Sequence, residues 1–241
     1  MSRARTLCLL AAACAATAGP SVAGAQFIGP TPYLSAADSP FAGLGFGWFH
    51  LEDFEDGALD TPGVALFGAG GSIVSPGTLT DAVDADGGPI DGSGATGRTL
   101  FSNFQRAEFT FDFDAVALGG LPTHAGIVWT DVANVTAGTF GFGDVTFEAF
   151  GPGLVPIGAT GPFTLGDGDF AGQTAEDRFF GIVAAGGIQR IRIGMANSVD
   201  WEVDHLQYGR LATVPEPSTV ALLTGGLAAA GAIGAARRRR R

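Results

Sequence analysis

Three acidic residues near the end of the sequence alternate along one short stretch. Asp200, Glu202 and Asp204 occupy every second position of SVDWEVDH, and in a β-strand every second side chain points to the same face. Three carboxylates on one face repel each other unless that face lies in water or holds a cation. Calcium prefers several oxygen ligands, so the spacing predicts either a structural calcium ion that includes Asp204 or a solvent-exposed face.

A second group of carboxylates lies in DAVDADGGPIDG, residues 81–92. Its acidic members are Asp81, Asp84, Asp86 and Asp91. A D-x-D-G segment begins a calcium-binding loop, but an EF-hand also requires an acidic or amide residue where Ala82 stands and a glutamate where Ser93 stands. The cluster therefore leaves two interpretations, a partial calcium loop and a hydrated acidic turn.

The residues that usually perform catalysis are scarce in this sequence. Its histidines are His50, His124 and His205, it has no lysine, and neither G-x-S-x-G nor H-E-x-x-H occurs. Carboxylate pairs such as Asp167 with Asp169, or Glu52 with Glu55, leave a glycoside hydrolase-like enzyme as an alternative, because such enzymes use two carboxyl groups. We expect a non-catalytic protein.

Aromatic residues offer a different chemistry. Trp48, Trp129, Trp201 and nineteen phenylalanines could stack on sugar rings if some were exposed on one face. We expect most of them to form the core, because the mature chain has no disulfide to stabilise it. A carbohydrate-binding module therefore remains an alternative function.

The N-terminus predicts export. Arg3 and Arg5 precede an apolar run over residues 7–18, and Ala23 and Ala25 have the small side chains that signal peptidase requires. We expect residues 1–25 to be a signal peptide that is cut before Gln26. Cys14 leaves a lipoprotein as an alternative, which Ala11 three residues before it disfavours.

The composition of residues 26–213 fits one folded domain. Both cysteines of the chain, Cys8 and Cys14, precede it, so the mature protein forms no disulfide. Six arginines stand against twenty-three aspartates and glutamates, a formal charge of −17. Such a surface repels nucleic acids and anionic lipids, so we expect no nucleic-acid partner.

The C-terminal segment 214–241 has three parts in order. Pro215, Glu216 and Pro217 are followed by residues 218–236, which carry no charge, and by the five arginines Arg237, Arg238, Arg239, Arg240 and Arg241. A helix of nineteen residues reaches about 28 Å, close to the ~30 Å hydrocarbon core of a bilayer. The arginines would stay in the cytoplasm by the positive-inside rule. A plain single-pass transmembrane anchor is one interpretation of this pattern.

This tail closely resembles the PEP-CTERM sorting signal of Gram-negative bacteria. The resemblance covers residues 214–241 and implies recognition and processing by an exosortase near Pro215–Pro217. It further implies a protein that crosses the inner membrane, is transiently anchored there, and is then released or attached at the cell surface, in a setting linked to exopolysaccharide and biofilm.

Alternating hydrophobic residues predict β-strands through the mature domain. In Glu108–Asp114, three phenylalanines face one side, and Thr110 and Asp112 face the other. Alternation also predicts strands at Asp144–Phe150, Arg190–Met195 and Val199–Tyr208. Shorter apolar runs predict strands that are covered on both faces at Trp48–Phe54, Val64–Phe67, Ala125–Trp129 and Phe179–Val183. Short strands separated by Gly-rich turns, without helices between them, predict an all-β, antiparallel sandwich.

Two stretches resemble jelly-roll carbohydrate-binding modules of the galactose-binding-like type. Residues 51–64, LEDFEDGALDTPGV, resemble their opening strand, and residues 201–209, WEVDHLQYG, resemble their closing strand. The resemblance implies that these strands lie side by side and share a structural calcium ion, with Glu55 (or Asp53) and Asp204 as ligands. HAGIVWTD and EDRFFGIVAAGGIQRIRI resemble uncharacterised domains of PEP-CTERM proteins, which brings no known activity.

Together these patterns predict an exported jelly-roll-like sandwich between two processing signals. We expect a structural or adhesive component of the cell surface or extracellular matrix, associated with exopolysaccharide. A carbohydrate-binding module for exopolysaccharide is the first alternative, and a secreted glycoside hydrolase-like enzyme is the second.

Overall fold

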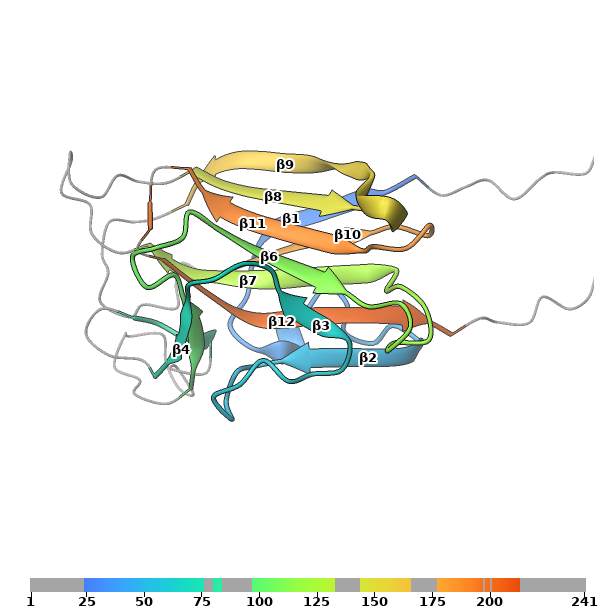
Figure 1. The fold of residues 1–241 in the computed structure, drawn as a ribbon, viewed down its shortest axis with the longest axis horizontal. Helices are drawn as coiled ribbons and strands as arrows, with labels where there is room; N and C mark the ends of the chain where they lie inside the picture. Colours follow the sequence, from blue (N-terminus) through green and yellow to red (C-terminus); the bar gives the residue numbers. More distant parts are fainter. Residues whose placement is uncertain are drawn as a thin grey trace, which may run out of the picture.

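The computed structural model describes residues 24–75, 80–83, 97–132, 144–165, 177–196, 198–199 and 201–212. They form two antiparallel β-sheets that face each other (Figure 1). Sheet A contains, in spatial order, β1 (Gln26–Pro32), β10 (Arg178–Val183), β7 (His124–Val132), β12 (Trp201–Leu211), β5 (Thr99–Phe101) and β4 (Ser72–Val74), with β2 (Phe46–Glu52) also paired to β12. Sheet B contains β3 (Val64–Leu66), β6 (Glu108–Phe113), β11 (Arg190–Met195), β8 (Asp144–Phe150) and β9 (Pro156–Thr164). The all-β, antiparallel architecture is therefore confirmed, and it is consistent with a β-sandwich.

The alternation predicted from the sequence produces the core between the sheets. On β6, Phe109, Phe111 and Phe113 point inward and are buried, as are Ile191 and Ile193 on the neighbouring β11. Burial of each such side chain contributes about 1.5–3 kcal/mol. The inward rows of the two sheets thus supply the stability that a cysteine-free domain needs.

Two of the three tryptophans belong to this core. Trp129 and Trp201 are fully buried, and each indole N–H has an acceptor: Trp129 donates to the sulfur of Met195 at 3.2 Å, and Trp201 donates to the carbonyl of Arg106 at 2.8 Å. Neither ring can serve as a platform for sugar stacking, and both belong to the aromatic core that the sequence predicts.

The first strand of the fold was not predicted. Residues 51–64 were expected to open the sandwich, but β1 precedes them and pairs with β10, with Gln26 opposite Val183. The expected adjacency of β2 and the last strand is present, since Leu51 lies opposite Gln207. β2 ends at Glu52, because Phe54 adopts a left-handed backbone conformation with φ of 56°.

The outer face of sheet A is covered by two segments. Residues 33–46, which include the short 3-10 helix η1 (Ala36–Asp38), and residues 80–83 lie over β7, β10 and β12. A second hydrophobic cluster fills the space beneath them; its buried members are Tyr33, Phe41, Val83, Val128 and Phe179. Side chains on this outer face are therefore enclosed rather than hydrated.

The two ends of the described domain leave from the same side. β1 begins and β12 ends at one edge of the sandwich (Figure 1), where Gln26, Val183, His124 and Gly209 follow one another across sheet A in register. No helix among the described residues is long and apolar enough to cross a membrane. The predicted span 218–236 and residues 1–23 of the signal peptide lie outside the described residues.

Candidate functional site

Asp204, the predicted calcium ligand of the last strand, lies at an irregularity in β12. The register of β12 against β7 shifts between Asp204 and Gln207, where His205 has a positive φ of 43°. The Asp204 carboxylate is fully buried. One oxygen accepts the backbone N–H of Val83 at 2.9 Å, and the other accepts that of His205 at 2.6 Å. Asp204 thus ties segment 80–83 to the central strand.

The solvent-exposed alternative for this strand face is wrong. Glu202 and Asp204 do share one face, as their spacing predicts, but both are fully buried. The face is dry because segments 33–46 and 80–83 cover it. Asp200, the third carboxylate of the pattern, lies outside the described residues.

The other predicted ligands occupy a different environment. Glu55 is exposed and its carboxylate accepts the backbone N–H of Arg98. Asp53 accepts the backbone N–H of Glu55 at 3.3 Å. The part of the chain that the structure describes contains no group of three or more His, Cys, Asp or Glu that could hold a metal ion. A calcium ion at Glu55 and Asp204 stays a prediction.

Glu52 is the acidic residue that organises the loop after β2, a role that differs from the catalytic pairing with Glu55 considered from the sequence. Its buried carboxylate accepts the backbone N–H groups of Phe54, Asp60 and Thr61 at 3.0, 3.1 and 3.2 Å, and also the hydroxyl of Thr61 at 3.0 Å. Because both oxygens are used in this way, Glu52 is a structural residue of the loop. The only sequence signal for it is a glutamate directly before a turn.

Of the acidic cluster at residues 81–92, the structure describes Asp81. This residue is buried, and its carboxylate accepts the backbone N–H of Ala82 at 2.8 Å. The other carboxylates of that cluster, Asp84, Asp86 and Asp91, lie outside the described residues. So does the possible catalytic pair Asp167 and Asp169. The same is true of the processing residues Ala23, Pro215, Glu216, Pro217 and Arg237–Arg241. Ala25 is exposed and directly precedes β1.

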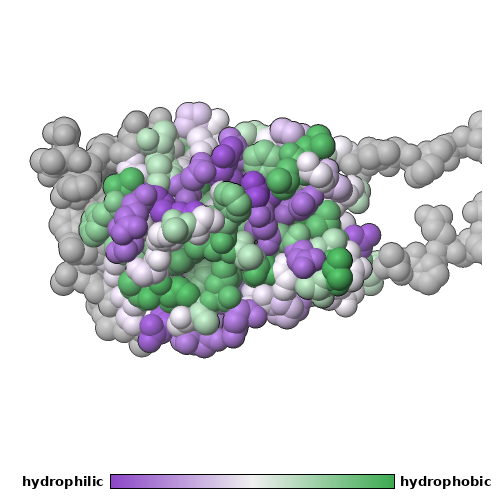
Figure 2. All heavy atoms as spheres, in the orientation of Figure 1, coloured by the Kyte–Doolittle hydropathy of each residue, from purple (hydrophilic) through white to green (hydrophobic). Residues whose placement is uncertain are grey.

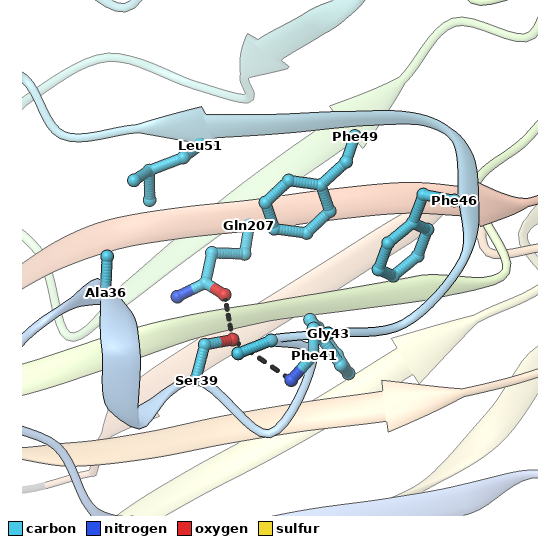
Figure 3. Close-up of a pocket in the computed structure, with 9 residues that line it drawn as sticks. Ala36, Ser39, Phe41, Gly43, Phe46, Phe49, Leu51 and Gln207 are labelled. Carbon is cyan, nitrogen blue, oxygen red and sulfur yellow. Dashed lines mark hydrogen bonds between the residues drawn. The ribbon is translucent and has the colours of Figure 1, made fainter.

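A pocket of about 180 Å³ lies on the covered side of sheet A (Figure 3). Phe46, Phe49 and Leu51 of β2 form one wall, residues 36–43 form the other, and Gln207 of β12 lies between them. An apolar cavity of about 150 Å³ can hold a molecule the size of benzene, so the volume suits one small apolar group. The sequence does not indicate this pocket, because Gln207 is distant in the chain from the two walls.

The polar groups beside the pocket form a chain of hydrogen bonds. Ser39 donates its hydroxyl to the side-chain oxygen of Gln207, whose amide donates to the hydroxyl of Tyr33 at 2.9 Å. The Tyr33 hydroxyl lies 2.9 Å from Nδ1 of His205. The Ser39 hydroxyl is therefore bonded to an amide rather than to a base, an arrangement that positions the loop and does not activate a nucleophile.

The outer face of sheet B is open and carries charged side chains beside aromatic rings. Arg190 bonds to Asp112, which raises the pKa of the guanidinium, and lies 4.7 Å over the ring of Phe67. Arg192 bonds to Glu148 and lies 5.5 Å over the ring of Phe150. Phe67 is 58% exposed. Figure 2 shows this face, on which hydrophilic and hydrophobic residues lie side by side.

A shallow depression of about 350 Å³ adjoins the second of these stacks. Glu148, Phe150 and Arg192 line it together with residues 156–159 of β9. Exposed rings with fixed arginine and carboxylate groups around them can stack on a sugar ring and hydrogen-bond its hydroxyls. This surface is therefore better suited to binding a polar polymer than the small pocket on sheet A.

Comparisons with protein-family models, with curated proteins and with solved structures find no match for this chain. The sequence signals at the two ends and the surfaces of the domain are therefore the features that indicate its function.

Proposed function

We propose that this protein is exported, is anchored briefly in the inner membrane by its C-terminal tail, and is then processed by an exosortase. The mature domain acts at the cell surface or in the extracellular matrix as a structural or adhesive component associated with exopolysaccharide. The observation that carries the proposal is that the two predicted processing signals flank one folded body.

The boundaries of that body support this reading. β1 begins at Gln26, directly after the expected signal peptidase site, and the last described hydrogen bond joins the Ala212 N–H to Gly45 three residues before Pro215. Cleavage at both signals would therefore remove none of the described strands. The fold proposed for the mature domain is a jelly-roll-like variant of the β-sandwich.

A non-catalytic role suits the surfaces of the domain. The carboxylates of Asp112 and Glu148 are bonded to arginines, and those of Glu52 hold a loop. Calcium bound through Glu55 and Asp204 belongs to the proposal as a structural ion. The hydrolase alternative gains no supporting observation.

Substitution of the sorting motif tests the proposal. In a host that has an exosortase, Glu216→Ala should leave full-length protein in the membrane fraction, because the processing enzyme would no longer recognise its motif. Ser218→Ala, two residues away and outside the motif, is the matched control and should be processed. Normal processing of Glu216→Ala would count against an exosortase substrate.

The open face of sheet B favours carbohydrate binding as the second candidate function. A pull-down of the mature protein with exopolysaccharide from the host tests it directly. Phe67→Ala should reduce retention several-fold, because stacking on an aromatic ring contributes about 1 kcal/mol or more. Phe104→Ala removes a ring that is 53% exposed elsewhere on the domain and should retain binding. Equal retention by both variants would exclude Phe67 as the sugar platform.

A further inference from the structure

The end of the sandwich from which both termini leave has its own surface character. We call this end the terminal face. It is made of residues 26, 43–46, 114–123, 151–156, 184–189 and 210–212, at the right-hand end of Figure 1. Backbone hydrogen bonds join these segments, for example from Ala184 to Thr123 at 2.9 Å and from Ala212 to Gly45 at 3.0 Å.

Exposed hydrophobic side chains gather on the terminal face. Of the nine large hydrophobic residues that are exposed among the described residues, five lie here: Leu44, Val116, Leu154, Val155 and Leu211. Val116 is 90% exposed and Val155 is 63% exposed. Scattered apolar residues on a surface need no explanation, but a group on one end marks a contact surface.

The same face carries almost no charge. The six segments contain one acidic residue, Asp114, and one basic residue, Arg210. Both already have partners: Asp114 accepts the N–H of Val116 at 2.7 Å, and Arg210 donates to the carbonyl of Leu121 at 2.8 Å. The face is thus neutral in a mature domain whose formal charge is −17.

The backbone holds the apolar side chains outward. Asp114 fixes a turn at whose tip Val116 stands, closed by a bond from the Gly120 N–H to Ala115 at 2.7 Å. Leu154 has a φ of 60°, a strained conformation for a residue with a side chain. Leu154 and Val155 are exposed at a turn whose backbone is strained, which indicates that their exposure has a functional reason.

The tail sets the distance between this face and a membrane. Six residue steps separate Ala212, which bonds to Gly45, from Ser218, where the uncharged stretch begins. Fully extended, six steps span about 20–22 Å, and the polar layer on each side of the hydrocarbon takes up ~5–7 Å of that length. Proline disfavours helix for itself and for the residue before it, so the sequence predicts an extended connection at Pro215 and Pro217.

We propose that the terminal face rests on the bilayer in which the tail is anchored. Val116, Val155 and Leu211 enter the boundary between headgroups and acyl chains, a depth of ~5–10 Å for interfacial apolar groups. The neutral face allows this approach, whereas the acidic remainder of the domain is directed away from anionic headgroups. This inference rests on the proposed membrane-anchored state, and it adds a defined orientation of the domain on the membrane.

Site-specific quenching tests the proposal. Residues 26–241 contain no cysteine, so V116C and V155C each provide one labelling site for a fluorescent dye. The tail-bearing precursor without its signal peptide, residues 26–241, is reconstituted through its tail into phosphatidylcholine vesicles that contain brominated acyl chains. F104C, at the end of the domain where β6 begins, is the matched control, since Phe104 is also exposed and apolar.

The expected result is quenching at positions 116 and 155 at least about threefold stronger than at position 104, because bromine quenches only dyes that reach the acyl boundary. Flotation of the vesicles, and protection of a dye at A228C within the uncharged stretch, report separately on the anchor. Flotation with equal quenching at 116 and 104 would overturn the orientation and leave the anchor intact. Failure to float would overturn the anchor and the orientation together.

Two further results would also overturn the proposal. Energy transfer between dyes at position 116 of two copies, independent of lipid, would make the terminal face a dimer interface. Protection of position 116 only when exosortase is present would assign the face to that protein rather than to lipid.

Discussion

Replacing Asp204 with asparagine tests both the buried contacts of β12 and the calcium prediction. The two carboxylate oxygens accept the N–H groups of Val83 and His205. In Asp204→Asn an amide NH₂ takes the place of one oxygen, so one buried N–H loses its acceptor and faces another donor. A hydrogen bond to a charged acceptor contributes about 1.5–3 kcal/mol, so we expect a loss near ~2 kcal/mol.

The assay is thermal unfolding of the purified mature protein in calcium and in EDTA. For a domain of 150–250 residues, 1 kcal/mol shifts the Tm by roughly 2–4 °C, so the variant should melt about 4–8 °C lower in EDTA. If Asp204 also holds calcium, the wild type gains about 2.7 kcal/mol at a calcium concentration of 100 times Kd. The difference between variant and wild type would then roughly double in calcium.

The outcomes separate the two parts of the argument. An equal loss in calcium and in EDTA removes calcium from Asp204 but keeps the hydrogen bonds. An unchanged Tm in both buffers would refute the conclusion that Asp204 fastens segment 80–83 to β12. Asp38→Asn changes an exposed carboxylate that bonds only within residues 34–38 among its described contacts, and it should shift the Tm by no more than about 2 °C as an exposed-site control.

Three other perturbations follow from the structure. Glu52→Ala should cost about 3 kcal/mol in denaturant unfolding because one buried and three partly buried donors lose their acceptor; a loss no larger than that of exposed Glu55→Ala would contradict the role of Glu52. Burial raises the pKa of Tyr208 to about 12, so the unfolded chain ionises at a lower pH than the folded protein. The free energy of unfolding should therefore fall by roughly 2–3 kcal/mol between pH 10 and 12. Tyr208→Phe should abolish this fall, and an unchanged pH dependence in that variant would contradict the assignment to Tyr208. Burial lowers the pKa of His124, so the free energy of unfolding should decline as the pH falls below about 6.5. The decline should be less steep in His124→Gln than in the wild type. The same decline in both proteins would show that His124 is not its cause.

The strands predicted from the sequence carry either side chains of alternating polarity or a continuous apolar run, as in β7 and β10. β6 and β11 alternate between buried hydrophobic residues and polar or charged ones, so their period of two is visible without any structure. β1 and β9 were missed because QFIGPTP and PIGATGPFT contain glycine and proline, which usually mark turns. Both strands stand at the outer edges of their described sheets, where a proline disrupts no central ladder.

The candidate site shows a limit of a different kind. The sequence correctly placed Glu202 and Asp204 on one strand face, but whether that face is wet depends on segments 33–46 and 80–83, which are far away in the chain. The pocket forms where Gln207 of β12 meets the neighbouring residues 36–51, which are far from it in the chain. Periodicity describes one strand at a time, and coverage by distant loops is a property of the assembled fold.

The order of strands in sheet A has a consequence for the time course of folding. β1 is synthesised first, yet it pairs with β10, and β12, the last of the described strands, lies between β7 and both β2 and β5. At a synthesis rate of roughly 5–20 residues per second, about 10–40 s separate the synthesis of β1 from that of β12. Sheet A cannot close before then, so its aromatic-rich strands remain unassembled during that time. The arrival of β12 therefore determines when the core between the two sheets can form.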